Sequence, residues 1–234
     1  MKRSTRSPQL GSGEAAHAPF CSFGEASHWL GIPDRTLRDW FQGRSGNEPA
    51  LRMSDPSQTF LSLADLAEAW ILASIRREHS ISLQSLRRAL QWMRERTDRS
   101  HPLAAIPLLT DGDSLLFEAF GQYVNASHQG QLEWRAIVEP CLKRIERDAD
   151  GSVVRMFPQS HLRQAPDERP VVIDPRVQFG RPCLAGTGVP TSVLFDRWAA
   201  GESAEELARD FGLAAEQVDE ALRFEARDAH RPAA

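Results

Sequence analysis

Two stripes of apolar residues, with members three or four positions apart, stand out within residues 21–41, CSFGEASHWLGIPDRTLRDWF. This spacing places the members of a stripe on one face of a helix. The first stripe is Ala26, Trp29 and Leu30, and the second is Leu37, Trp40 and Phe41. The pattern predicts two short helices that each bury one face.

The residues around the stripes mark the helix ends. Ser22 followed by Glu25 is the pattern of a capping box, which predicts the start of the first helix. Gly31 can adopt the left-handed conformation that ends a helix, and Ile32 can fold back onto the apolar side. Pro33 suits the first turn of the second helix, where a backbone N–H is not needed. We therefore expect two helices joined by a tight turn.

The remaining face of the second helix is polar and carries Asp34, Arg35, Arg38 and Gln42. This layout is typical of a helix-turn-helix, which places its second helix in the major groove of DNA. The alternative is an ordinary helical hairpin with a solvated charged face. The short turn, the small Ala26 where the helices must approach, and the arginines favour DNA binding.

Two longer helices are predicted next. Apolar residues follow a helical period in residues 60–80 and again in 80–96, and Ser62 and Ser82 are suitable N-caps. The two helices form an antiparallel pair or a bent rod. They support the DNA-binding unit, build a dimer interface, or form a core hairpin within one monomer, and the pattern leaves these alternatives open.

The middle of the chain indicates a small mixed layer. Asp111-Gly112 lies between two apolar runs and predicts a β-hairpin. Apolar spacing in residues 134–148 predicts a helix, which Pro140 kinks or restarts. Residues 152–157 are then expected to form a strand.

After a polar, proline-rich linker at 158–170, three short helices are predicted. Residues 171–190 indicate turns and short extended pieces first. Thr191 is expected to cap the first helix, and Ser203 with Glu206 the second. The outer faces of these helices are acidic, at Glu202, Glu205, Asp210, Glu216, Asp219 and Glu220. Because carboxylates repel phosphates, a protein partner or a dimer mate suits this unit better than DNA.

Composition and charge describe a globular chain. The 234 residues carry a net charge of −4, yet residues 1–100 hold 14 basic against 11 acidic residues. The N-terminal part is therefore the better candidate for contact with phosphates. No apolar run reaches the roughly 18 residues of a membrane span, and the N-terminus lacks an apolar signal region. We expect a cytoplasmic protein that does not contact a membrane.

Candidate catalytic and metal-binding residues do not assemble into a pattern. Cys21, Cys141 and Cys183 are far apart, which argues against disulfides and zinc and favours reduced, buried side chains. The GTG at 186–188 is not a phosphate loop. The aspartates at 111–113 suit a turn better than a metal site. The sequence predicts neither an enzyme nor a cofactor.

The first motif resembles the MerR-type winged helix-turn-helix. The matching residues are Ala26, Leu30, Gly31, Ile32, Thr36, Leu37, Arg38 and Trp40. The resemblance implies that the second helix meets DNA and that the loop after it, RSGNEPALR, is a wing whose arginines can touch phosphates. The expected DNA-contacting residues are Arg35, Thr36, Arg38, Gln42, Arg44 and Arg52.

Residues 171–226 resemble a bacterial domain family long described only as uncharacterised. Its signature combines Asp-Pro, Gly-Arg-Pro and Gly-Thr-Arg-Val-Pro with a glycine-capped helix and a Leu-rich final pair. The matching residues are Asp174, Pro175, Gly180, Arg181, Pro182, Gly186, Thr187, Val189, Pro190, Gly201, Ser203, Glu206, Leu207, Ala221 and Leu222. Gly188 is a departure, because the family usually has arginine there.

A MerR-like reader joined to that domain resembles the antitoxins of VapBC-type toxin–antitoxin pairs. The resemblance implies that the chain neutralises a PIN-type RNase toxin and represses its own operon by binding operator DNA. A homodimer would place two recognition helices on one face of the DNA. The alternative is a stand-alone MerR-like transcriptional regulator without a toxin partner.

The expected fold is mainly α with small β elements, in the α+β class. A winged helix-turn-helix with a helical hairpin is followed by a three-helix, helix-turn-helix-like domain. The expected boundaries are a disordered arm at 1–19, a DNA-binding domain with its mixed extension at 20–157, a linker at 158–170, the C-terminal domain at 171–228 and a tail at 229–234.

Overall fold

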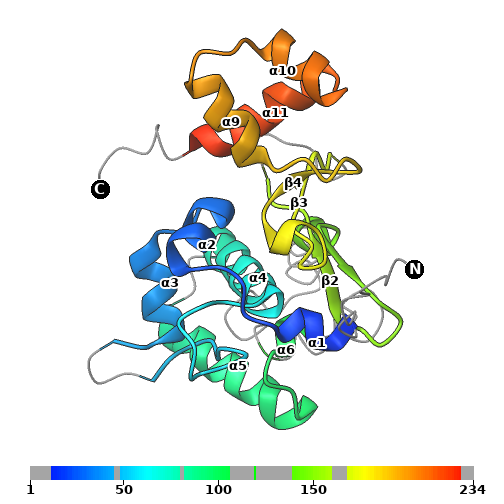
Figure 1. Ribbon diagram of the computed structural model, residues 1–234. Coiled ribbons are helices and arrows are strands. Elements are labelled where there is room, and N and C mark those ends of the chain that lie inside the picture. Colours follow the sequence, from blue (N-terminus) through cyan, green and yellow to red (C-terminus); the bar gives the residue numbers. More distant parts are fainter. Residues whose placement is uncertain are drawn as a thin grey trace.

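The computed structural model describes residues 12–44, 48–79, 82–105, 119, 139–159 and 168–227. Helices dominate these residues, and the strands form two antiparallel sheets of two strands each, so the predicted α+β class is confirmed (Figure 1). In chain order the elements are α1 (Ser12–His17), α2 (Phe23–Leu30), α3 (Asp34–Phe41), α4 (Leu63–His79), α5 (Leu83–Thr97), α6 (Pro102–Ala105), β1 (Ile145–Arg147), β2 (Val153–Met156), β3 (Val171–Val172), η1 (Gln178–Gly180), β4 (Cys183–Leu184), α9 (Thr191–Ala199), α10 (Ala204–Phe211) and α11 (Ala215–Glu225).

Helices α2 and α3 form as predicted, with a tight turn between them. The Ser22 hydroxyl accepts a hydrogen bond from the Glu25 N–H, and the Glu25 carboxylate accepts one from the Ser22 N–H at 2.8 Å. Gly31 has φ 64° and closes α2, and Ile32 is buried behind it. Both predicted stripes are buried, namely Ala26, Trp29, Leu30, Leu37, Trp40 and Phe41.

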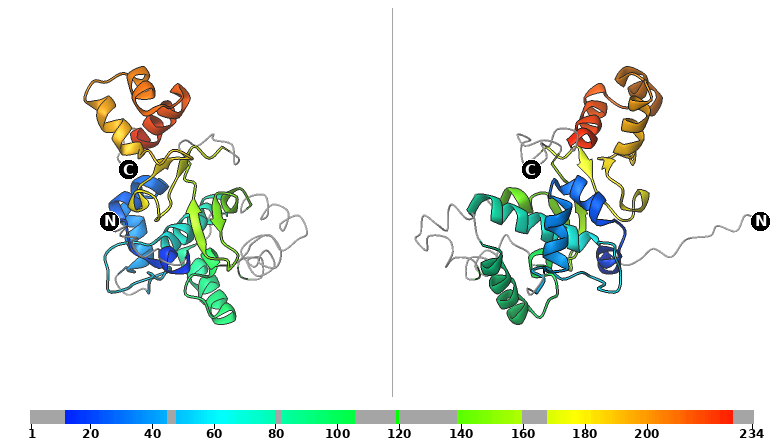
Figure 2. Two further views of the ribbon diagram at one scale, coloured as in Figure 1. Left: turned by 45° about the vertical axis from the view of Figure 1, so that its right-hand side comes forward. Right: turned by 90° about the vertical axis from the view of Figure 1, so that its left-hand side faces the viewer.

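Helix α4 is the centre of the larger core. Every residue from 61 to 75 is buried, and α4 contacts α1, α2, α6 and β2. Figures 1 and 2 show α4 in the middle of this part of the molecule, between α2 and the β2 strand. Ser62 caps α4 by accepting from the Asp65 N–H at 3.2 Å, and Ser82 caps α5, both as predicted. Helix α5 buries Leu86 and Met93 in the same core.

The helix predicted over residues 134–148 is wrong at its C-terminal end. Residues 139–142 are helical, but Ile145–Arg147 is strand β1 and pairs with β2. The Asp148 carboxylate accepts from the N–H of Asp150 and of Ser152, which builds a tight hairpin turn. Ile145 lies three residues after Leu142. This spacing is compatible with one continuous helix and equally with a helix that is followed by a strand. The hairpin predicted around Asp111-Gly112 lies outside the described residues.

The segment expected to be a disordered arm contains helix α1. Ala15 and Ala16 are buried, and α1 contacts α4 and β2. The expectation of disorder is therefore wrong for residues 12–17. Small residues such as these give little hydrophobic signal in the sequence, but they allow a short helix to approach its neighbours closely.

The C-terminal helices α9, α10 and α11 pack around a small core of their own, made of Leu184, Leu194, Leu207, Val218 and Ala221. Ser203 and Glu206 form the predicted capping box of α10. Thr191 is not the cap of α9, because the helix begins at Thr191 and Pro190 occupies the cap position. The Thr191 hydroxyl instead donates to the Pro182 carbonyl at 3.2 Å and to Glu225.

Extended segments join the two parts of the chain. Strands β3 and β4 pair with each other, and Ile173 pairs with Met156 beyond the end of β3. Val171 and Ile173 consequently belong to the larger core around α4. Residues 168–170 are described and lead directly into β3. The C-terminal segment thus begins as part of the N-terminal core.

A buried polar network lies beside α4. The Asp65 carboxylate lies 2.9 Å from Nε2 of His101 and accepts from the Ser54 N–H at 2.9 Å. Glu68 accepts from a backbone N–H at 3.0 Å. Burial raises the pKa of Glu68 to about 7. Burial alone would lower the pKa of His101, but the hydrogen bond to Asp65 and the charge of Glu68 raise it above its ordinary value.

The free energy of unfolding is expected to fall as the pH rises from about 5 to about 8. A glutamate in water has a pKa of 4.5 and Glu68 has a pKa of about 7 in the folded chain, so the folded state binds more protons in this interval. The raised pKa of His101 acts in the same direction above pH 6.5. The Glu68→Gln variant should flatten this dependence and gain up to about 3 kcal/mol at pH 8. Urea unfolding at several pH values measures it, and an unchanged slope would rule out Glu68 as the responsible group.

Candidate nucleic-acid interface

The buried stripe of α3 fixes which of its side chains reach solvent. Leu37 is fully buried and Trp40 is 2 % exposed, so this face cannot turn away from the core. Arg35, Arg38 and Gln42 are consequently exposed on the opposite side, as predicted. The local sequence thus dictates an outward polar face on the second helix of a helix–turn–helix arrangement.

The two arginines of α3 differ in their surroundings. Nε of Arg38 donates to the Asp34 carboxylate at 2.7 Å, and the guanidinium lies 4.8 Å from the centre of the Phe23 ring. Both contacts hold Arg38 in place, and Asp34 offsets part of its charge. Arg35 has no ion-pair partner among residues 12–44 and the other described ranges. Arg35 therefore presents the stronger positive charge on this face.

The other predicted contact residues lie on α3 itself and on the segment that follows it. Thr36 is half-buried, whereas Arg44 and Arg52 are exposed on the segment that follows the helix. The N–H groups of Ala50 and Leu51 donate to the Trp40 carbonyl at 2.8 and 2.9 Å, which ties this segment to the end of α3. Residues 48–60 form turns and bends, and residues 45–47 of the expected wing lie outside the described residues.

The end of α11 is seated on α2, the helix that precedes the turn. The Arg227 guanidinium donates to the carbonyls of His28 and Trp29 at 3.4 and 3.0 Å, in the last turn of α2. Its Cζ lies 4.3 Å from the centre of the Phe224 ring, and Phe224 is part of the larger core. A cation at a helix C-terminus satisfies free carbonyls and interacts favourably with the helix dipole.

A second polar contact joins the same two helices. Nε2 of His28 lies 2.8 Å from the Glu225 carboxylate, and the two side chains are only 19 % and 12 % exposed. Glu225 also accepts the hydroxyl of Thr191 at the start of α9. The C-terminal helices are therefore held at the last turn of α2, just before the Gly31 turn that leads into α3.

The outer surface of α9–α11 is acidic, as predicted. Residues 191–227 contain nine acidic and four basic residues. Arg197 on α9 binds both Glu202 and Asp210, which links the first two helices. Glu205 and Glu216 remain exposed. This surface repels phosphates, so the candidate nucleic-acid interface is confined to α3 and the segment after it.

Ser54, His101 and Asp65 lie together, but their geometry is not that of a catalytic triad. Ser54 Oγ is 3.4 Å and Asp65 Oδ1 is 2.9 Å from the same ring nitrogen, Nε2 of His101. A triad uses the two ring nitrogens for its two partners. Within the described part of the chain, no group of three or more His, Cys, Asp or Glu side chains could hold a metal ion.

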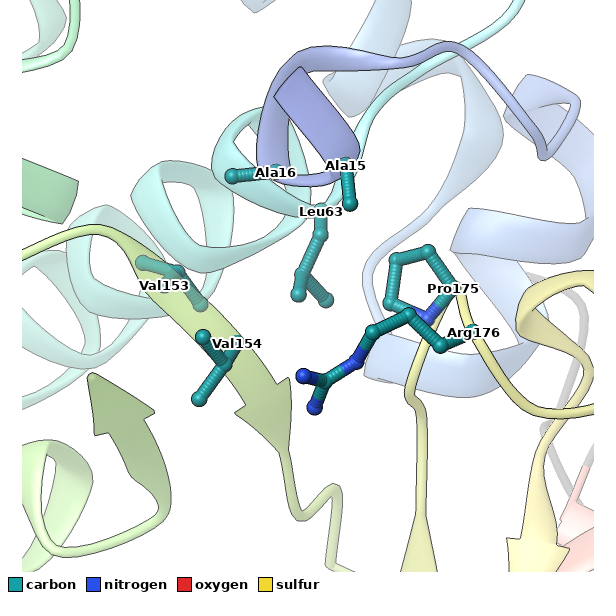
Figure 3. Close-up of a pocket in the computed structure, with 7 residues that line it drawn as sticks. All are labelled: Ala15, Ala16, Leu63, Val153, Val154, Pro175 and Arg176. Carbon is teal, nitrogen blue, oxygen red and sulfur yellow. The ribbon is translucent and has the colours of Figure 1, made fainter. Parts of the chain in front are cut away.

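A shallow hollow lies between α1 and β2 (Figure 3). It is lined by Ala15, Ala16, Leu63, Val153, Val154, Pro175 and Arg176. Its walls are apolar, and the Arg176 guanidinium is already bound by the Asp174 carboxylate at 2.9 and 2.8 Å. The one charged side chain in the lining of this hollow is therefore already bound along its Nε–Nη2 edge. No helix of the described residues is long and apolar enough to cross a membrane.

Comparisons with known proteins place these features in context. Residues 171–224 match a family described as "Protein of unknown function (DUF433)". The chain is 29 % identical over 228 residues to "Putative antitoxin VapB45" of Mycobacterium tuberculosis, covering 87 % of this chain and 92 % of that protein. It is 24 % identical over 226 residues to "Uncharacterized protein Rv2308" of the same organism, covering 86 % and 88 % of the two chains.

A solved structure shares the fold. The X-ray crystal structure of Rv2018 from Mycobacterium tuberculosis matches with a TM-score of 0.68 and 26 % sequence identity, covering 88 % of this chain and 98 % of that chain. The structural similarity thus covers most of both chains.

The contact between α2 and α11 could not be predicted from the sequence. Arg227 is 198 residues away from Trp29, and neither residue belongs to a motif that points to the other. The available signal is weak, because it consists only of a basic residue, Arg227, just beyond the last helix.

Replacing Arg227 with alanine is expected to destabilise the α2–α3 unit. The carbonyls at the end of α2 lose a charged donor, which should lower the free energy of unfolding by about 1–3 kcal/mol. Chemical denaturation measures the loss, and hydrogen exchange should show faster exchange in α2 and the Gly31 turn. Arg223 is the matched control, because it is 56 % exposed on α11 and its ion pairs are with Asp219 and Glu220 of the same helix. Arg223→Ala should change stability by less than about 0.5 kcal/mol, and equal losses in the two variants would contradict this role for Arg227.

Proposed function

We propose that this chain is an antitoxin that binds DNA through α3 and neutralises a protein toxin. The observation that carries the proposal is the exposed arginine face of α3, which a buried apolar stripe holds outward. The similarity to a protein named as an antitoxin, which extends over most of both chains, supports the antitoxin role. DNA binding is inferred from the physical chemistry of α3 and from the resemblance of its sequence to MerR-type readers.

In the proposed complex α3 enters the major groove of operator DNA. Arg35 and Arg38 reach base edges or phosphates, and Thr36 and Gln42 contribute polar contacts at the two sides of the helix. Arg44 and Arg52 contact the phosphate backbone from the segment after α3. Arg38 must exchange its partner Asp34 for DNA, so its net contribution is smaller than that of Arg35.

The partner protein is assigned to the C-terminal segment, residues 171–227, because the acidic helices α9–α11 make this segment unsuited to DNA. We infer a PIN-type RNase as the toxin, on the basis of the VapBC-type resemblance of the sequence. Repression of the chain's own operon follows if the operator lies upstream of the two genes. A homodimer would present two copies of α3 about 34–36 Å apart, one turn of the double helix.

A stand-alone transcriptional regulator is the second candidate. The observation that favours it is that buried residues of the chain's own core, Leu37 and Trp40, position the arginine face of α3. The neighbouring open reading frame distinguishes the two candidates. A short gene for an RNase with an acidic site next to this one favours the antitoxin, and its absence favours the regulator.

Operator affinity is expected to depend on Arg35 more than on Arg38. Arg35→Ala should weaken binding to upstream DNA by about 1–3 kcal/mol if it reads a base, and each lost phosphate contact should reduce the salt slope by about 1. Asp34→Asn should strengthen binding, because it releases Arg38 from its ion pair. Fluorescence anisotropy at several salt concentrations measures both changes.

The control for these variants is Arg88→Ala, which removes an exposed arginine from α5. This variant should leave the affinity and the salt slope unchanged. If Arg35→Ala and Arg38→Ala bind upstream DNA with the original affinity and slope, α3 is not the reader and the DNA-binding part of the proposal fails.

Co-expression with the product of the adjacent gene is expected to yield a complex that co-purifies through size-exclusion chromatography. The same co-expression should restore growth to cells that the neighbouring product alone inhibits. A neighbouring product that inhibits growth equally in the presence and absence of this chain would contradict the antitoxin role.

A further inference from the structure

The loop 176–181 exposes an aromatic side chain to an unusual degree. Phe179, in the middle of η1, is 88 % exposed, whereas the next most exposed large apolar residues in the described ranges, Phe60 and Trp198, are 46 % exposed. A phenylalanine on a protein surface gains nothing from solvent. The backbone of the loop fixes the position of the Phe179 side chain, so the exposure of this side chain needs a separate explanation.

The backbone at this point is strained. Gln178 has φ 49° and Phe179 has φ 56° with ψ 34°, so two successive residues with side chains lie in the left-handed region. The other such residue among those described, Asp98, closes helix α5 and is explained by that role. Left-handed geometry is unfavourable for residues with a Cβ and persists only where the surroundings impose it.

Two sets of contacts impose this geometry. Gly180, the residue after Phe179, is buried under the ring of Phe20, and a Cβ at position 180 would overlap that ring. On the other side, the Asp174 carboxylate accepts from the backbone N–H and the guanidinium of Arg176. The loop is therefore anchored at both ends and holds Phe179 in one position.

The surface around Phe179 is positively charged. The Asp174 carboxylate is 3 % exposed, but the two guanidiniums that bind it, those of Arg155 and Arg176, are 47 % and 44 % exposed. The Asp174 charge is buried and the Arg176 guanidinium faces solvent, whereas Arg155 also pairs with the partly exposed Glu146 at 3.4 Å. Arg181 is exposed as well, and it has no ion-pair partner within the part of the chain that the structure describes.

We propose that Phe179, flanked by Arg176 and Arg181, is the docking point for the protein partner, which receives the ring in an apolar pocket rimmed by carboxylates. This inference rests on the proposed function, because the partner is the toxin of that proposal. Aromatic residues and arginines dominate the binding energy of protein interfaces. A loop that is already rigid loses little conformational entropy on binding.

A protein fits this surface better than DNA does. The Asp174 carboxylate occupies the Nε–Nη2 edge of the Arg176 guanidinium, so part of its hydrogen-bonding capacity is already used within the chain. Phe179 gains from desolvation in an apolar pocket, which a protein supplies directly. The same chain already presents a separate arginine face on α3 for nucleic acid. The basic loop also differs in charge from the acidic surface of α9–α11. A variant on that acidic surface therefore serves as the control in the test.

The test measures binding of the full-length chain to the purified product of the adjacent gene. Phe179→Ala is expected to weaken binding about 10- to 100-fold, mainly through faster dissociation. Arg181→Glu is expected to slow association with this product. It should also reverse part of the salt dependence of the association rate. Trp198→Ala, which removes the exposed aromatic residue of α9, is the matched control and should change the affinity less than about threefold.

Phe179→Gly separates docking from folding. Glycine accepts the left-handed backbone, so this variant should raise the midpoint of thermal unfolding while it weakens partner binding as much as Phe179→Ala. A variant that is more stable yet binds more weakly identifies a residue retained for binding. A merely structural role for Phe179 predicts the opposite change in stability.

The outcomes distinguish the inference from the proposed function. If the unchanged chain binds the neighbouring product and both Phe179 variants bind within threefold of it, the docking point lies elsewhere and the antitoxin proposal stands. If the Phe179 variants lose operator DNA but not the protein, the loop is a nucleic-acid contact and the inference is overturned. If the unchanged chain does not bind the product at all, the proposed function fails and this inference fails with it.

Discussion

Helix α4 is buried on every side through residues 63–75, and this constraint determines where the other elements can lie. A helix without a solvent face must be enclosed completely, so α1, α2, α6 and β2 form a shell around it. The enclosure has an electrostatic consequence. Asp65 and Glu68 occupy α4 itself and lose their water, so they require His101, the Ser62 cap and backbone N–H groups as partners.

The enclosure of α4 also explains the direction in which α3 faces. Helix α2 packs on α4, and the tight Gly31 turn leaves α3 few orientations in which Leu37 and Trp40 stay buried. The arginine face is therefore a result of core packing and does not depend on a bound ligand. Arg227 strengthens this arrangement from outside the core, because it satisfies the carbonyls at the end of α2 just before the turn.

Local signals in the sequence predicted most of the helices. Capping boxes at Ser22 and Ser203 and apolar stripes such as Leu37–Trp40–Phe41 concern residues a few positions apart, and the structure confirms them. The exposed face of α3 followed from the same stripe. The signals failed where a short segment satisfies two patterns. Ile145 continues a helical spacing, yet its pairing with Met156 depends on a turn that the Asp148 carboxylate builds.

Long-range contacts lay beyond the reach of the sequence. The seat of α11 on α2 joins residues about two hundred positions apart, and the burial of Gly180 under Phe20 joins residues 160 positions apart. The strain at Phe179 was equally hidden, because no pattern of residue types shows that a phenylalanine has a positive φ. The family signature identified Gly180 and Arg181 as notable positions, but it gave no physical reason for either.

These long-range contacts determine how the loop 176–181 and the arginine face of α3 can act together. Phe20 precedes α2 and covers Gly180, and Arg227 follows α11 and binds the end of α2. The loop 176–181 and the arginine face of α3 are therefore both fixed to α2, one near its beginning and one through the turn after its end. A partner bound at Phe179 would be held in a constant position relative to DNA bound at α3. Any effect of one ligand on the other could then arise from their shapes and charges alone, without a change of conformation in the chain that joins them.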